Sequence, residues 1–221
     1  MSVASFYGRW ADLYDRVATA PGVARWRRAA VEALALAPGD TVVEMGCGTG
    51  ANLPQLRRAV GPSGRVVGLD LTRPLLERAR DRADRAGWSN VHLLEADMRA
   101  PPLREADAVL GTFVCGMVEH PGATVEHWCE LADGRVALLE ASSSAHPVGR
   151  LLAPAFGAFV GAGQPADSLA GSLGNALSRR AVRSLDGRVA AARAALTRRT
   201  VERRYRTFGL GYVGLLSGRV A

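Results

Sequence analysis

Residues 41–52 read TVVEMGCGTGAN, a short apolar run followed by a carboxylate and a glycine-rich loop. Thr41 to Val43 are β-branched and are bounded by Gly39 and the loop glycines, so they predict a short buried strand. The loop glycines tolerate positive φ and leave their backbone N–H groups open to a ligand. Pro54 follows within the first turns of the next segment, where a helix tolerates proline best. The stretch predicts a strand, a ligand-binding loop and a helix in succession.

Carboxylates also end the next two apolar runs. Asp70 lies near the end of the run at residues 65–71, about twenty residues past the loop, where a carboxylate can accept both hydroxyls of a ribose. Asp97 closes residues 91–97 and precedes Met98, a pair that suits the amino group and the ring face of an adenine. Each aspartate could instead cap the following helix. The glycine spacing also fits nicotinamide and flavin sites, so the loop by itself leaves the cofactor open.

These motifs resemble those of the class I S-adenosylmethionine-dependent methyltransferases, in particular the UbiE/COQ5-like group that methylates quinone precursors and related lipids. The resemblance covers residues 5–141 and has a weaker echo at the C-terminus. It rests on FYGRWADLYD at 6–15, the loop at 44–50, DLT at 70–72, ADM at 96–98 and LLEAS at 138–142. It implies an α/β, Rossmann-like fold with a seven-stranded, mostly parallel sheet, flanking helices and an antiparallel last strand.

The resemblance also implies S-adenosylmethionine as the cofactor and a role for each motif. The glycine loop faces the methionine end of the cofactor, the second motif faces the ribose, and the third faces the adenine. The end of the fourth strand lies beneath the sulfonium. The cofactor-binding residues expected on this basis are Glu44, Gly46, Cys47, Gly48, Gly50, Asn52, Asp70, Leu71, Asp97, Met98, Thr112 and Phe113.

The chain contains no lysine, and all 28 of its basic residues are arginines. A Walker-type phosphate loop, the Tyr-x-x-x-Lys pair of short-chain reductases and Schiff-base chemistry all need a lysine. These enzyme classes are therefore excluded. Two alternatives to a methyltransferase stay open. One is a nicotinamide-dependent oxidoreductase, against which Asp97 and Met98 count, and the other is a non-catalytic protein that binds the cofactor or a lipid surface.

Length and composition fit one soluble α/β domain. The 221 residues are enough to bury a full core, and 48% of them are hydrophobic. No apolar run reaches the roughly 20 residues of a membrane span, and residues 2–10 lack a signal-peptide core, so we expect a cytoplasmic protein. Cys47, Cys115 and Cys129 are odd in number and lack Cys-x-x-Cys spacing. We therefore expect neither a disulfide framework nor a bound metal.

The order of elements predicts strands alternating with helices. Residues 73–86 predict a helix that begins after Thr72 and ends at Gly87. Further strands are expected at 107–113 and 135–140, with a helix at 123–131 between them. Within a single domain of residues 1–221 we expect a helical cap at 1–37, a cofactor-binding core at 38–146, a helical insertion or cover at 147–199 and a closing β-hairpin at 200–221.

The net charge of +7 is concentrated in the C-terminal third, because twelve arginines and only three acidic residues occur from position 147 onward. A helix over residues 178–199 places Val182, Leu185, Val189, Ala192 and Leu196 on one face and most of its arginines elsewhere. This pattern indicates either the solvated side of a packed helix or a peripheral contact with an anionic membrane. Few aromatic residues accompany the arginines, which argues against nucleic acid.

Methyl transfer depends mainly on alignment, so the sequence marks catalytic groups less clearly than the cofactor site. Tyr7 and Tyr14 are seven residues apart, on one face of an N-terminal helix, where they could cover the cofactor. His120 follows the fourth strand and is the other expected catalytic residue. Further acceptor-side candidates are Glu119, Glu140 and His146.

One segment departs from the family. UbiE/COQ5-like enzymes usually carry an Arg-Asn pair after the fourth strand, whereas this chain has Cys115, Gly116 and Met117 there. This difference counts against methylation of a quinone ring. Together with the apolar residues 151–160, it indicates another small, hydrophobic acceptor.

Overall fold

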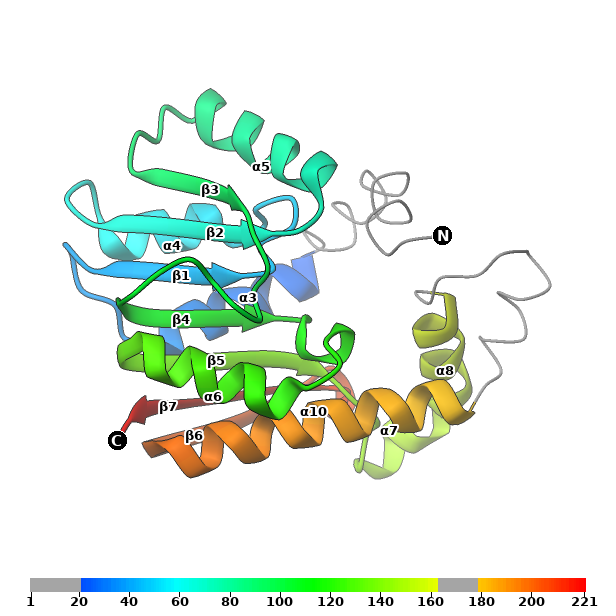
Figure 1. Ribbon diagram of the computed structural model, residues 1–221. Helices are drawn as coiled ribbons and strands as arrows, with labels where there is room; N and C mark the ends of the chain where they lie inside the picture. The colour runs from blue at the N-terminus through cyan, green and yellow to red at the C-terminus, as the bar shows by residue number, and fades with distance from the viewer. Residues whose placement is uncertain (1–20, 163–178) are drawn as a thin grey trace.

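The apolar run before the glycine loop forms strand β1 in the interior of a seven-stranded sheet. The computed structural model describes residues 21–162 and 179–221 (Figure 1). In chain order its elements are α3 (Pro21–Ala33), β1 (Thr41–Met45), α4 (Leu53–Val60), β2 (Arg65–Asp70), α5 (Arg73–Arg85), β3 (Val91–Glu95), β4 (Ala106–Thr112), the 3-10 turn η1 (Cys115–Met117), α6 (Pro121–Leu131), β5 (Ala132–Ala141), α7 (Pro147–Leu151), α8 (Ala153–Ala162), α10 (Arg179–Arg199), β6 (Thr200–Phe208), the turn η2 (Gly209–Gly211) and β7 (Val213–Val220).

The strands follow the order β3-β2-β1-β4-β5-β7-β6. Strands β1 to β5 are parallel, and β7 lies antiparallel between β5 and β6. The fold expected from the sequence, a mostly parallel sheet whose last strand is antiparallel, is confirmed. Because β1 to β4 run the same way, the loops that follow them meet at one edge of the sheet, called here the carboxyl edge.

Two hydrophobic layers cover the sheet, one on each face. Val42 and Val66 pack with residues of α3, α4 and α5, whereas Val43 and Val67 pack with residues of α6 and α10. Neighbouring residues of one strand thus enter opposite layers, as the two-residue period of a strand requires. Helices on both faces explain why these strands are apolar throughout.

Most element boundaries agree with the sequence, and the differences have local causes. Helix α5 ends before Gly87, whose φ of 65° allows the left-handed turn expected there. Strand β3 ends at Glu95 rather than at Asp97, because the Asp97 carboxylate accepts the backbone N–H of Arg99 and turns the chain. Strand β5 begins at Ala132, three residues earlier than expected, and pairs with Ala106 through a register shift in β4.

Helix α10 is a packed helix whose apolar stripe faces the protein. Val189, Ala192 and Leu196 are buried, and the helix lies against α6. Arg188 donates to the Gly116 carbonyl (2.9 Å), and Arg198 pairs with Glu126 at 2.8 Å. Much of the basic charge of this helix is therefore engaged within the molecule.

None of the helices in residues 21–162 and 179–221 combines the length and the apolar character needed to cross a bilayer. Cys47, Cys115 and Cys129 are all buried free thiols. In the same described ranges, no three His, Cys, Asp or Glu side chains are grouped so that they could hold a metal ion.

Candidate functional site

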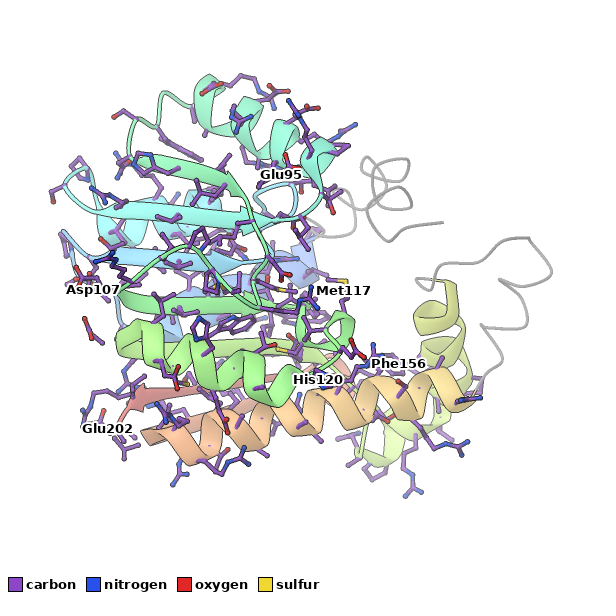
Figure 2. All side chains as sticks on the ribbon, viewed as in Figure 1. Glu95, Asp107, Met117, His120, Phe156 and Glu202 are labelled. Carbon is purple, nitrogen blue, oxygen red and sulfur yellow. The ribbon has the colours of Figure 1, made fainter. Side chains whose placement is uncertain are left out.

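A pocket of about 360 Å³ opens at the carboxyl edge of the sheet. Its walls come from the loops after four strands, β1 to β4, and from the start of α5. The lining residues are Gly46, Gly48, Asp70, Leu71, Thr72, Leu75, Ala96, Asp97, Met98, Arg99, Val114, Met117, Val118 and Glu119. Met117 and His120 lie at this edge in Figure 2, whereas Asp107 lies at the opposite edge.

The Asp70 carboxylate joins two of these loops. Its Oδ2 accepts the backbone N–H of Gly48 at 2.9 Å, and its Oδ1 accepts the N–H of Thr72 at 2.8 Å. Each carboxylate oxygen has a second lone pair that can accept a further hydrogen bond. Asp70 is therefore held in one orientation on the wall of the pocket, with acceptor capacity left for a ligand.

Gly46 shapes the floor of the pocket. Its φ of 65° lies in the left-handed region, and a Cβ at this position would stand 2.5 Å from Cγ1 of Val114 and 3.6 Å from the sulfur of Met98. Only glycine combines this backbone conformation with such a close approach of the loop after β4. The loops after β1, β3 and β4 are in mutual contact here.

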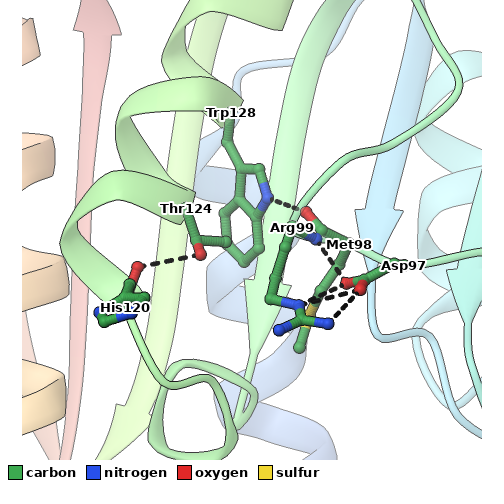
Figure 3. A network of polar contacts seen from close by, with 6 residues as sticks. All are labelled: Asp97, Met98, Arg99, His120, Thr124 and Trp128. Carbon is green, nitrogen blue, oxygen red and sulfur yellow. Dashed lines mark hydrogen bonds and ion pairs between the residues drawn. The ribbon is translucent and has the colours of Figure 1, made fainter.

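Asp97, at the mouth of the pocket, is paired with Arg99 (Figure 3). The Arg99 guanidinium donates to Asp97 at 2.9 Å through Nε and at 2.6 Å through Nη2. This hydrogen-bonded cation lowers the pKa of the Asp97 carboxyl. The neighbouring carbonyl of Met98 accepts the indole N–H of Trp128 (2.7 Å), which fixes the loop to α6.

The wall formed by residues 114–119 is held from behind by two charged side chains. Glu140 Oε1 accepts the backbone N–H groups of Val114 (3.0 Å) and Cys115 (2.9 Å). Arg188 binds the Gly116 carbonyl from the other side. Glu140 is fully buried, and burial raises its pKa. Oε1 of Glu140 therefore holds this loop, and the expectation that Glu140 lies on the acceptor side stays a prediction.

A second polar cluster is buried behind the glycine loop, at the ends of β1 and β4. Arg27 donates to Thr112 Oγ1 at 2.7 Å and stacks over the ring of Phe113, 5.3 Å from its centroid. Asn52 Nδ2 donates to both Thr112 Oγ1, at 3.1 Å, and Glu44 Oε1. Arg27 Nε, Glu44 Oε2 and Asn52 Oδ1 are buried with no hydrogen-bond partner within the described part of the chain. Burial raises the pKa of Glu44 to about 7, although Asn52 and Arg27 act to lower it.

Comparison with known proteins agrees with this geometry. Residues 42–134 match the family model of a methyltransferase domain. The chain is 30% identical over 177 residues to the ubiquinone/menaquinone biosynthesis C-methyltransferase UbiE of Pseudomonas putida, which covers 78% of this chain and 65% of that protein. It is 33% identical over 153 residues to the 2-phytyl-1,4-naphtoquinone methyltransferase of Thermosynechococcus vestitus, with 66% of each chain covered.

The crystal structure of magnesium protoporphyrin IX methyltransferase (ChlM) from Synechocystis PCC 6803, with bound SAH, matches over the full length of both chains with a TM-score of 0.65 and 16% identity. The chain belongs to the class I S-adenosylmethionine-dependent methyltransferases. It is of the UbiE-like type, so the family expected from the sequence is confirmed. The chain spans about two thirds or less of the length of the curated relatives it matches.

The expected cofactor residues divide into two groups in this structure. Those on the wall of the pocket are Gly46, Gly48, Asp70, Leu71, Asp97 and Met98. Those buried behind the loop are Glu44, Cys47, Asn52 and Thr112. Gly50, with a φ of 76°, packs against Leu53 and Ala79, and Phe113 lies against Arg27. Their contacts with a cofactor remain predictions.

The expected catalytic residues are less well placed. Tyr7 and Tyr14 lie outside the described residues. His120 is exposed immediately before α6, and its carbonyl accepts both the N–H and the hydroxyl of Thr124. Its ring is not part of the pocket lining. His146 is likewise exposed, at the start of α7.

Several residues of the site carry no signal in the sequence. Arg27 is one of several arginines on α3, and nothing in its neighbours marks it as buried beneath the pocket. Arg188 and Arg99 reach the loops from positions that no motif identifies. Arg99 is a partial exception. It directly follows Met98 in the sequence, so a cation close to the Asp97 carboxylate could have been predicted.

We expect the free energy of unfolding to depend on pH through the buried carboxyl of Glu44. Since the folded state raises this pKa from 4.5 to about 7, the group's contribution is fully present below pH 4.5 and is lost as the pH rises through 7. The loss is on the order of 3 kcal/mol. Glu44→Gln has no carboxyl to ionise at this position and therefore avoids this loss. Its free energy of urea unfolding, relative to that of the wild type, should increase between pH 5 and pH 8. The same difference at both pH values would contradict the assignment.

Proposed function

We propose that this chain binds S-adenosylmethionine in the pocket and transfers its methyl group to a small, hydrophobic acceptor. The observation that carries the proposal is Asp70, a carboxylate fixed by two backbone amides at the end of β2, beside the glycine loop. Such a carboxylate can accept the two hydroxyls of a ribose. The family membership supports the same cofactor.

The remaining contacts follow from the position of the ribose. The amides of Gly46 and Gly48 would bind the methionine end, with Glu44 and Asn52 behind them. Leu71 lies beside the ribose position, and Asp97 and Met98 would contact the adenine. The Arg99 guanidinium already donates to both oxygens of Asp97, so an adenine amino group would share that carboxylate with the guanidinium. Thr112 would act through the buried cluster rather than from the pocket wall.

The segment after β4 contributes apolar side chains to the side of the pocket where we place the acceptor. Val114, Met117 and Val118 line the pocket, and Met117 is half exposed at its rim. The names of the relatives indicate quinone and naphthoquinone precursors for those enzymes. The sulfonium of the cofactor supplies an activated methyl group, so the protein's part is to align the acceptor and exclude water. Glu140 and Arg188 serve this alignment by holding residues 114–116.

We propose a cytoplasmic protein that touches an anionic membrane peripherally. Helix α10 supports this only at its N-terminal end, where Arg180 and Arg183 are exposed. Arg188 and Arg198 bind within the protein. The described contacts therefore favour a packed role for most of this helix.

The first test is a calorimetric titration with S-adenosylhomocysteine, with NADH as the parallel ligand. Binding of S-adenosylhomocysteine alone supports the proposal, and binding of NADH alone would favour a nicotinamide-dependent oxidoreductase. A non-catalytic binding protein would bind S-adenosylhomocysteine but turn over none of a panel of quinone, lipid and amine acceptors. Binding of neither ligand would contradict the assignment of the pocket.

Asp70→Asn should weaken S-adenosylhomocysteine binding by on the order of 2 kcal/mol, because a charged hydrogen-bond acceptor is lost from the ribose site. Asparagine keeps one oxygen for the backbone N–H of Gly48 or Thr72, so this variant perturbs the loops less than alanine does. Calorimetry measures the affinity, and thermal unfolding reports the integrity of the loops. An unchanged affinity would show that the ribose binds elsewhere.

Gly46→Ala should abolish measurable S-adenosylhomocysteine binding, because the new Cβ overlaps Val114 at the floor of the pocket. Gly87→Ala is the matched control. Both glycines have a φ of 65°, but no heavy atom lies within 4 Å of a Cβ at Gly87. Backbone strain should cost each variant roughly 1 kcal/mol of stability. Gly46→Ala should lose more than this because of the overlap with Val114, and only Gly46→Ala should lose binding. Equal affinities for the two variants would contradict the placement of the cofactor.

A further inference from the structure

Four large apolar side chains are exposed together on helix α7 and the adjoining turn η2. They are Val148 (51% exposed), Leu151 (79%), Leu152 (49%) and Leu210 (45%), and we call them the α7 patch. Leu152 directly follows α7, and α7 is in contact with turn η2, so the four residues lie on adjoining segments. Isolated exposed leucines are ordinary, whereas a group at the tips of two adjoining turns indicates a contact surface.

The α7 patch is held rigidly. Gly149 lets α7 approach the Leu210 carbonyl so closely that no Cβ would fit between them. The same carbonyl accepts the Ser144 hydroxyl at 2.5 Å, and the Tyr212 hydroxyl donates to the Gly149 carbonyl at 2.7 Å. The ring of Phe156 on α8 packs against Tyr212, with centroids 4.5 Å apart. The leucines are therefore presented by a fixed scaffold.

Leu210 is also strained. Its φ of 56° and ψ of 32° place a branched apolar residue in the left-handed region, which glycine or asparagine would occupy at lower cost. Folding alone favours glycine here, since nearly half of the leucine surface stays exposed and only part of the side chain gains burial. A strained and exposed leucine is explained if its side chain is buried in a complex.

The charge around the α7 patch is mostly positive, although Asp186 accepts the backbone N–H of Ser143 at 2.7 Å beside it. Arg150 lies within α7, and Arg180 and Arg183 are exposed at the end of α10 that contacts α8. From Ser142 to Ala162 the sequence contains no acidic residue. Apolar tips among arginines match the two layers of an anionic bilayer surface, whose phosphates attract the guanidinium groups and whose acyl region accepts the leucines.

We propose that the α7 patch docks this protein onto the surface of an anionic phospholipid bilayer. A second copy of the chain fits less well, because four side chains are too few for the roughly 800 Å² per partner of a stable interface and the arginines would repel one another. The proposal rests on the membrane contact proposed above, moves its centre from α10 to the α7 patch, with Arg180 and Arg183 at the rim, and goes beyond the proposed methyl transfer. The α7 patch lies at the carboxyl edge, because α7 follows β5 and η2 precedes β7 there. The α7 patch and the loops that line the pocket therefore share one edge of the sheet.

Sedimentation with vesicles tests the proposal without cofactor or acceptor. The full chain should bind vesicles of equal parts phosphatidylcholine and phosphatidylglycerol at low salt, and bind pure phosphatidylcholine vesicles at least about tenfold more weakly. Leu151→Asp and Leu210→Asp should each lower the partition coefficient about tenfold or more, since they remove a buried apolar side chain and add a repelled charge.

Matched controls come from elsewhere on the surface. Val201→Asp changes an exposed apolar residue at the opposite end of β6, and Arg58→Glu reverses an exposed charge on α4. Both controls should have partition coefficients within about twofold of that of the wild type. In the same assay, Arg150→Glu should have a partition coefficient about tenfold lower. Leu151→Asp should bind S-adenosylhomocysteine with the affinity of the wild type, so failure of the docking proposal and failure of the cofactor proposal give different results.

Three outcomes would overturn the proposal. The wild type could fail to bind either kind of vesicle, or Leu151→Asp could bind as well as Val201→Asp. Light scattering could also show a wild-type dimer that Leu151→Asp dissolves, which would assign the α7 patch to a second copy of the chain.

Discussion

A single carboxylate ties the glycine loop to the rest of the pocket. Asp70 ends β2 and accepts hydrogen bonds from the loop after β1 and from the start of the segment that leads into α5. Without such an acceptor, the N–H of Gly48 would face the pocket with no partner in the sheet. The parallel sheet brings the strand ends together, but it leaves their loops free to move apart. The bridge through Asp70 converts two neighbouring loops into one surface of defined shape.

Two other buried carboxylates, Glu44 and Glu140, stand behind that surface and are stabilised in different ways. Glu140 accepts two backbone N–H groups and lies near the partly buried Arg193, so hydrogen bonds and a nearby cation compensate its negative charge. One oxygen of Glu44 accepts a hydrogen bond from Asn52, and the other has no partner among residues 21–162 and 179–221. Burying a partly satisfied carboxylate costs stability, and such a cost is retained where a site uses the group. The contrast favours a holding role for Glu140 and a ligand-linked role for Glu44.

The sequence predicted the strands and helix ends of this protein better than the side-chain contacts in its interior. Runs of β-branched residues and the glycines after them are local signals, so β1, β2 and the end of α5 at Gly87 could be read directly. The hydrogen bond of Arg27 to Thr112 joins residues 85 positions apart, and that of Arg188 to Gly116 joins residues 72 apart. Such pairings depend on how helices pack onto the sheet, which no local pattern encodes. The charge of α10 shows the same limit, since composition cannot tell a paired arginine from one that faces solvent.

The arrangement of charge and apolar surface suggests how the fold separates its two tasks. The side chains that shape the pocket come from the first four strands, whereas the exposed leucines come from the segments after β5 and β6. The antiparallel insertion of β7 makes this possible, because it places turn η2 at the same edge as the cofactor loops while keeping it in a separate part of the chain. Changes in α7 or η2 can alter the surface that the protein contacts without moving Asp70 or the glycine loop. An exposed, strained Leu210 is then tolerated because its strain is confined to a turn that takes no part in holding the pocket.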